Sequence, residues 1–167
     1  SYRGDTLNLG EDKDPLRSSI IIRIPQSISD TLELRQSFIA RVKNEKIRYI
    51  SSRKDDSHIY ANISSLGKYI ISRDSIKPYI KPINFKQNSN VSNRSSIKLR
   101  LKDDLSGIRS YNGFLNGKWA LFEYEPKSNL IFHKISDGII NKGKNVLLIK
   151  YQDGVGNKGV YEATLYF

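Results

Sequence analysis

Apolar and polar residues alternate along most of the chain with a period of two, which is the period of a β-strand with one buried face. The clearest example is Ile97-Lys98-Leu99-Arg100-Leu101-Lys102, in which apolar and basic side chains alternate without exception. No stretch shows the period of about 3.6 residues that an amphipathic helix requires. We therefore predict an all-β protein with little helix.

The second half of the chain contains a series of apolar runs separated by turn residues. One separator is Asn116-Gly117, a pair that accepts positive φ at both positions and predicts a tight hairpin. Short strands at this spacing are typical of a β-sandwich, and we expect an immunoglobulin-like one with about seven strands. The predicted strands are 79–85, 96–102, 108–115, 118–124, 129–134, 145–152 and 160–167.

The first half of the chain contains fewer apolar runs. Five strands are few for a closed two-sheet core, so either the first dozen residues add a strand or the beginning of the domain is cut away. Residues 1–15 are rich in turn formers and indicate a loop or a ragged end. The predicted strands are 18–24, 36–42, 46–51, 59–63 and 67–73.

Pro78 and Pro82 mark the boundary between the two halves, because residues before proline are restricted to extended conformations. We therefore predict two tandem β-sandwich modules. The first module comprises residues 1–77, and its beginning is either present or cut away. The second comprises residues 78–167 and is the immunoglobulin-like module.

Composition narrows the functional classes. The chain has 167 residues and a formal charge of +11. It has no cysteine, and this excludes disulfides, thiolate nucleophiles and sulfur-ligated zinc. No apolar run approaches the length of about 18 residues that a membrane-spanning helix needs. We therefore predict a chain without a transmembrane segment, which is soluble or at most tethered by something outside it. The positive charge is not clustered as in nucleic-acid-binding proteins, and we predict no nucleic-acid partner. A start at Ser1 without a leader indicates a fragment of a longer polypeptide.

The motifs that suggest catalysis or cofactor binding lack their structural context. Gly154-Val155-Gly156-Asn157-Lys158-Gly159 matches the dinucleotide fingerprint, but a predicted strand follows it where a helix is required. We interpret it as the turn between the last two strands. His58 and His133 are the only histidines, and we expect both to be surface or half-buried structural residues. We predict no catalytic residue, no cofactor and no metal ligand of the zinc type.

Two acidic loops leave one question open. Asp103, Asp104 and Asp153 stand in turn sequences, where such side chains usually bond their own backbone. If the two loops meet at one end of the sandwich, their carboxylates could instead gather calcium.

Two groups of residues are candidates for ligand binding. Trp119, Tyr111 and Tyr124 would form a stacking platform for sugars or a protein if their rings face solvent, although aromatic residues of a sandwich usually build the core. We predict that Trp119 and Tyr124 lie on one strand, with Tyr111 across the hairpin. The alternating strand would present Lys98, Arg100 and Lys102 as a basic face, which can also be a solvated edge.

Several strings taken together resemble the C-terminal, non-catalytic region of secreted bacterial zinc metallopeptidases of the lysostaphin-like, peptidoglycan-cleaving class. The resemblance covers residue 16 to the end. Two of its elements, Asp-x-x-Ser-Gly-Ile and Asp-x-x-Gly-Asn, also recur in bacterial immunoglobulin-like surface repeats. The strings are Leu66-Gly67-Lys68-Tyr69-Ile70-Ile71-Ser72-Arg73-Asp74, Ile80-Lys81-Pro82-Ile83-Asn84-Phe85, Asp103-Asp104-Leu105-Ser106-Gly107-Ile108, Asn116-Gly117-Lys118-Trp119 and Asp153-Gly154-Val155-Gly156-Asn157.

The resemblance implies a non-catalytic accessory region, because the zinc-binding His-x-His element of that family is absent here. It implies export to the periplasm or cell surface, with the cell-wall polymer or an upstream peptidase domain as partner. A rigid spacer without a ligand fits the same parentage. The alternative is a carbohydrate-binding or adhesin-type immunoglobulin-like surface module that uses Trp119 and its tyrosine neighbours.

Overall fold

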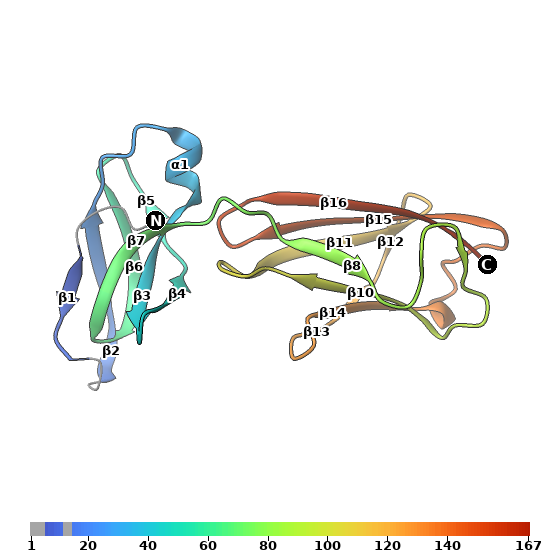
Figure 1. Cartoon of the computed structure of the whole chain (residues 1–167), viewed down its shortest axis with the longest axis horizontal. Helices are drawn as coiled ribbons and strands as arrows, with labels where there is room; N and C mark the ends of the chain where they lie inside the picture. Colours follow the sequence, from blue (N-terminus) through green and yellow to red (C-terminus); the bar gives the residue numbers. More distant parts are fainter. Residues whose placement is uncertain (1–5, 12–14) are drawn as a thin grey trace. The chain divides into compact units, whose positions relative to one another are not determined.

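The structure is a computed structural model that describes residues 6–11 and 15–167, and it is built almost entirely of β-strands (Figure 1). This confirms the all-β prediction. In these residues the helical elements are α1 (Thr31–Gln36) and the 3₁₀ turn η1 (Ile135–Asp137), and neither is long and apolar enough to cross a membrane. The chain forms two compact units. The first holds the described residues up to Ile76 together with Gly154–Gly156, and the second holds Lys77–Asp153 and Asn157–Phe167.

The first unit contains two sheets that share one core. One sheet has the strand order β1-β7-β3-β4 and the other β2-β6-β5. Alternate residues of the strands point inward, and most of the inward positions are occupied by isoleucine. The buried isoleucines of this core are Ile22, Ile24, Ile39, Ile59, Ile63 and Ile71. The strands are β1 (Leu7–Leu9), β2 (Pro15–Pro25), β3 (Ser37–Lys43), β4 (Lys46–Ile50), β5 (Arg53–Lys54), β6 (His58–Ser65) and β7 (Gly67–Arg73).

The N-terminal segment contributes more than the predicted loop. Leu7–Leu9 pairs antiparallel with β7, so the first dozen residues do add a strand to the sheet. Strand β2 already begins at Pro15, because the long β2 pairs with β6 as far as Ser65. The loop prediction is therefore wrong for these two segments, while residues 1–5 and 12–14 lie outside the described residues.

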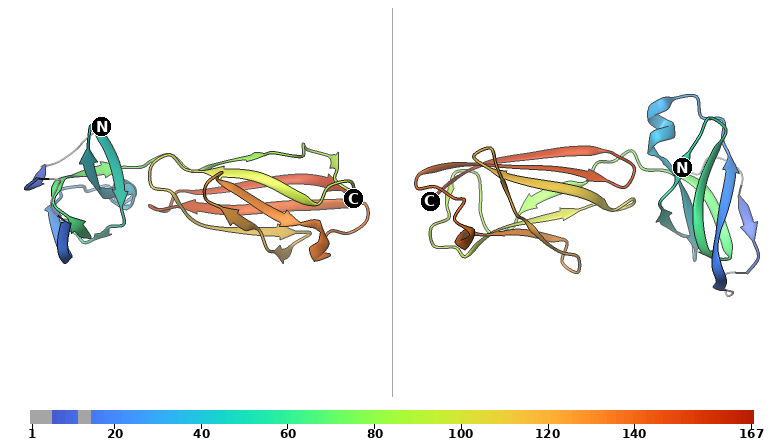
Figure 2. Two further views of the ribbon diagram at one scale, coloured as in Figure 1. Left: turned by 90° about the horizontal axis from the view of Figure 1, so that it is seen from below. Right: turned by 180° about the vertical axis from the view of Figure 1, so that it is seen from behind.

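The second unit is a sandwich of two antiparallel sheets with one core, apart from a parallel contact at β9 (Figure 2). The orders are β13-β14-β10-β8 and β12-β11-β15-β16-β9. Leu99, Ile131, Leu147 and Ile149 are fully buried between the sheets. The strands are β8 (Tyr79–Pro82), β9 (Ser89–Asn90), β10 (Ser96–Lys102), β11 (Ile108–Leu115), β12 (Lys118–Ala120), β13 (Glu123–Glu125), β14 (Leu130–Lys134), β15 (Lys144–Asp153) and β16 (Lys158–Tyr166).

One predicted strand of the second unit is wrong. The run 118–124 is divided into β12, which pairs in the five-stranded sheet, and β13, which pairs in the four-stranded sheet. Phe122 lies in the crossing segment and is 3% exposed, with its ring against Gly113 of β11. This division, together with the short β9, is why the unit has more strands than the seven expected.

The turns follow the predicted chemistry. Asn116 and Gly117 have φ of 53° and 77° and connect β11 to β12, as the hairpin prediction requires. The glycine-rich string at 154–159 connects β15 to β16 and continues into a strand, which confirms that it is a turn. No helix follows it to hold a pyrophosphate.

Candidate binding surface

The predicted basic face lies on the outer side of the four-stranded sheet. Strand β10 buries Ile97, Leu99 and Leu101 and leaves the alternate residues on the opposite side. Of these, Arg100 is exposed, whereas Lys98 is half-buried. Burial of one side of the strand therefore fixes which side carries the positive charges.

The strands beside β10 give this face a charge pattern. Residues directly opposite each other in an antiparallel pair lie on the same face. In the register, Phe132 of β14 lies between Lys98 of β10 and Glu123 of β13, and Leu130 lies between Arg100 and Glu125. We call these the basic row (Lys98, Arg100), the apolar row (Leu130, Phe132) and the acidic row (Glu123, Glu125).

A groove of about 750 Å³ runs over this face within the second unit. This volume lies within the range of about 300 to 1,000 Å³ that is common for ligand-binding clefts. The apolar row, the acidic row and Lys98 all contribute to its walls. The lining residues are Ser95, Ser96, Lys98, Glu123, Tyr124, Glu125, Pro126, Leu130, Phe132, Lys134 and Ser136.

The charged residues of this face differ in their partners. Lys134 and Glu123 form an ion pair of 2.7 Å, and this hydrogen bond raises the pKa of Lys134. Lys102 forms an ion pair with Asp104, which likewise raises the pKa of Lys102. Glu125 accepts a hydrogen bond of 2.8 Å from the Ser128 hydroxyl. Neither Lys98 nor Arg100 has an ion-pair partner among the residues that the structure describes.

The three predicted aromatic site residues do not form one platform. Trp119 is 57% exposed on β12, in the five-stranded sheet. Tyr124 lies on β13 in the other sheet, so the prediction that the two share a strand is wrong. Tyr111 packs beside Tyr124, with ring centroids 6.1 Å apart, and donates a hydrogen bond of 2.7 Å to the Phe122 carbonyl. Burial raises the pKa of Tyr111.

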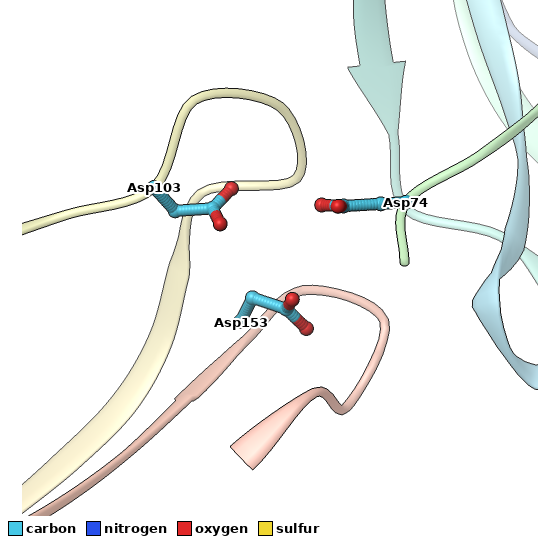
Figure 3. Close-up of side chains that lie close together, drawn as sticks. All are labelled: Asp74, Asp103 and Asp153. Atoms are coloured by element: carbon cyan, nitrogen blue, oxygen red, sulfur yellow. The ribbon is translucent and has the colours of Figure 1, made fainter. Parts of the chain in front are cut away.

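The two acidic loops of the second unit do meet (Figure 3). Carboxylate oxygens of Asp103 and Asp153 lie within 4.8 Å of each other. Asp103 accepts hydrogen bonds from the backbone N–H of Leu105 (3.0 Å) and of Gly107 (2.7 Å). Asp153 accepts from the backbone N–H (2.8 Å) and the side-chain amide (2.7 Å) of Asn157. Both carboxylates therefore close turns.

Asp104 does not join this pair, because its carboxylate holds Lys102. Calcium takes about six to eight oxygen ligands, and two carboxylates that already accept backbone hydrogen bonds supply only part of that number. Calcium binding at these loops stays a hypothesis.

The histidines have structural surroundings. His133 is fully buried in the second unit, where its Nδ1 lies 2.9 Å from the Leu121 carbonyl oxygen and its ring lies 5.4 Å from that of Phe122. The expectation of a surface or half-buried His133 is therefore wrong, because β14 turns this residue into the core. His58 is half-buried, and its backbone N–H donates to Asp55.

Sequence reasoning found Lys98 and Tyr124 but missed the rest of the groove. The alternation of Leu130, Phe132 and Lys134 around Ile131 and His133 was a usable signal for which residues of that strand face outward. Nothing in a single strand, however, states which strand lies beside it, and the groove exists only because β13, β14 and β10 are neighbours.

Comparison with known proteins adds one structural likeness. No family model matches the chain, and no curated protein matches it. Among solved structures, the chain is similar to one described as "Structures of Clostridium thermocellum CbhA fibronectin(III)-like modules", with 14% identity and a TM-score of 0.42. The match covers 89% of this chain and 86% of that chain.

Proposed function

We propose that the chain is a non-catalytic accessory region of an exported bacterial cell-wall metallopeptidase, and that it positions the enzyme at the envelope by binding the wall polymer. The observation that carries this proposal is the groove on the four-stranded sheet, whose lining includes Lys98 of the basic row. The resemblance of residues 16–167 to the C-terminal regions of such enzymes supplies the parentage, and it implies a location in the periplasm or at the cell surface.

Charge gives this surface a means of attraction to the wall. Wall polymers carry carboxylates and phosphates, and the chain carries a formal charge of +11. Lys98 and Arg100 have no carboxylate partner within the described residues, so their charges are available to an anion. Interactions of this kind weaken as salt screens them over a distance of about 8 to 10 Å at ionic strengths of about 0.1 to 0.15 M.

The test is a pull-down of the chain on purified peptidoglycan sacculi at about 0.02 M and about 0.5 M salt, between which screening changes strongly. We expect retention at low salt and release at high salt. A variant with Lys98→Gln and Arg100→Gln should lose most of the low-salt retention. Absence of retention by the unaltered chain at both salt concentrations would overturn wall binding and leave a spacer.

A second candidate function is favoured by one observation. Trp119 is 57% exposed, and its cross-strand partner is the half-buried Phe114, whose ring lies 5.6 Å from the Lys150 ammonium. Exposed aromatic faces of this kind stack against sugars, as a carbohydrate-binding or adhesin-type module requires. In the same pull-down, Trp119→Ala separates the two functions. We expect Trp119→Ala to leave retention unchanged. Loss of retention by Trp119→Ala, with retention kept by the variant of Lys98 and Arg100, would favour the second candidate.

A further inference from the structure

The groove has an asymmetry that a site for a neutral polymer does not need. The apolar row contributes to its lining, and this row has carboxylates on one side and cations on the other. The order is the same at both register positions, with Phe132 between Glu123 and Lys98 and Leu130 between Glu125 and Arg100. A ligand that fills the groove therefore meets opposite charges on its two sides.

Lys98 is the residue of the basic row that lines the groove. It is half-buried and lines the groove, yet it has no carboxylate partner among the described residues. Its neighbours Lys134 and Lys102 each hold a carboxylate. An ammonium that has lost part of its hydration gains more from a ligand carboxylate than one that is already paired, because the charge-assisted hydrogen bond is new.

The spacing of the rows matches an extended polypeptide. Neighbouring strands lie about 4.8 Å apart, so the acidic and basic rows are separated by about 10 Å across β14. Successive side chains of an extended peptide point to opposite sides, so a peptide lying along the apolar row can turn acidic groups toward one row and basic groups toward the other. A neutral glycan offers neither charge.

We propose that the groove binds a short extended peptide that carries both a free carboxylate and a free amine. The carboxylate pairs with Lys98, the amine lies toward Glu125, and the apolar part of the peptide covers Phe132. This inference rests on the proposed function, since it names the peptide of the wall polymer, and not its glycan, as the part that the groove takes.

The experiment is an NMR titration of the whole chain with three soluble probes. They are the tetrapeptide Ala-Glu-Lys-Ala, the same peptide with its carboxylates amidated and its amines acetylated, and the neutral sugar chitotetraose. We expect the charged tetrapeptide to shift the amide signals of β13, β14 and β10, and the other two probes to leave them unchanged.

Two variants test the roles of the residues. Lys98→Gln should weaken binding of the charged peptide about tenfold, the value of one charge-assisted hydrogen bond. Glu125→Gln should also weaken binding of that peptide, because the peptide amine then lacks its carboxylate partner. Lys102→Gln is the matched control, because Lys102 lies on the same face of β10 but is held by Asp104 outside the groove, and it should bind as the unaltered chain does.

The outcomes separate this inference from the function on which it rests. Equal binding of the blocked peptide, or binding of chitotetraose in its place, would overturn the peptide assignment. Salt-sensitive retention on sacculi without binding of the charged peptide would also overturn it, but would leave the wall-binding function standing. Loss of both would remove both proposals, and a thermal melt of each variant shows that it is folded.

Discussion

At the residue scale, the placement of a charge decides what it does. Lys98 and Lys102 stand four positions apart on one face of one strand, but only Lys102 is held by a carboxylate. The sequence Lys102-Asp103-Asp104 contains the signal for that ion pair, because the acid follows the base after one residue. No such signal exists for Lys98, whose surroundings come from β13 and β14. The sequence therefore could not predict that the Lys98 ammonium is left to pair with a ligand.

Lys54 gives a pH dependence that can be measured. It lies on β5, donates a hydrogen bond to the Arg35 carbonyl, and has a pKa lowered from 10.5 to about 8 by burial and, secondarily, by the Arg35 charge. Between these two values the unfolded chain binds more protons than the folded chain. Since stability rises with pH wherever that is so, the free energy of unfolding should rise from pH 8 toward pH 10.5.

The check is an NMR titration of the Lys54 side chain together with urea unfolding followed by circular dichroism. We expect a titration midpoint near 8 for Lys54. The Lys54→Met variant should lack this contribution to the rise of stability with pH, and the difference between the two proteins isolates it from the tyrosines. A midpoint for Lys54 that stays at the ordinary value of 10.5 would contradict the prediction.

At the element scale, strands with alternating residues were predicted well and changes of sheet were not. The run 96–102 is a strand with the predicted bounds, because one buried face forces the alternation. The run 118–124 looks continuous, but its chain crosses between sheets at Leu121 and Phe122. Apolar residues serve equally for a strand and for a buried crossing, so periodicity alone could not separate them.

The short helix α1 was missed for a different reason. It has only six residues, too few to show a period. The signal that was present is Asp30 followed three residues later by Glu33, since the Asp30 side chain accepts from the Glu33 backbone N–H and caps the helix.

The pairing of β15 with β16 depends on one glycine. Gly159 lies opposite Tyr151, and a Cβ at position 159 would lie 2.2 Å from the tyrosine ring. Gly159→Ala should therefore lower the free energy of unfolding by about 1–3 kcal/mol, the usual cost of overpacking. Chemical denaturation followed by Trp119 fluorescence measures it.

Two further variants test whether the cost comes from the contact between Tyr151 and position 159. Val160→Ala is the control on the same strand, and because Val160 is 62% exposed its cost should stay within about 0.5 kcal/mol. In the Gly159→Ala background, Tyr151→Leu should cost less than it does in the unaltered chain, because there the substitution also removes the clash with the alanine Cβ. Additive costs would show that the ring and position 159 do not interact.

At the scale of the whole molecule, each unit has a core of its own. The buried cluster of the second unit draws only on residues from Phe85 to Leu165, and that of the first unit only on residues from Ile22 to Ile71. The proline-containing segment that suggested a boundary at residue 77 lies at the start of the second unit. Composition shifts were of no help there, because both halves of the chain are basic.

A self-contained core has a consequence for the isolated second half. Residues 77–167, expressed alone, should fold, give the circular dichroism spectrum of a β-sandwich, and unfold cooperatively with the Trp119 fluorescence change of the whole chain. The groove lies within these residues, so the fragment should also bind whatever the whole chain binds there. A fragment that lacks cooperative unfolding would show that the second unit depends on the first.

The strands at the sheet edges of the second unit bear on its behaviour at high concentration. The four-stranded sheet ends at β13, which has three residues of which two are glutamates, and at β8, which ends in a proline. The five-stranded sheet ends at β12 and β9, with three and two residues. Such edges offer few free N–H and C=O groups on which another chain can add a strand. Many copies of the second unit can therefore be crowded together without their sheets joining into aggregates.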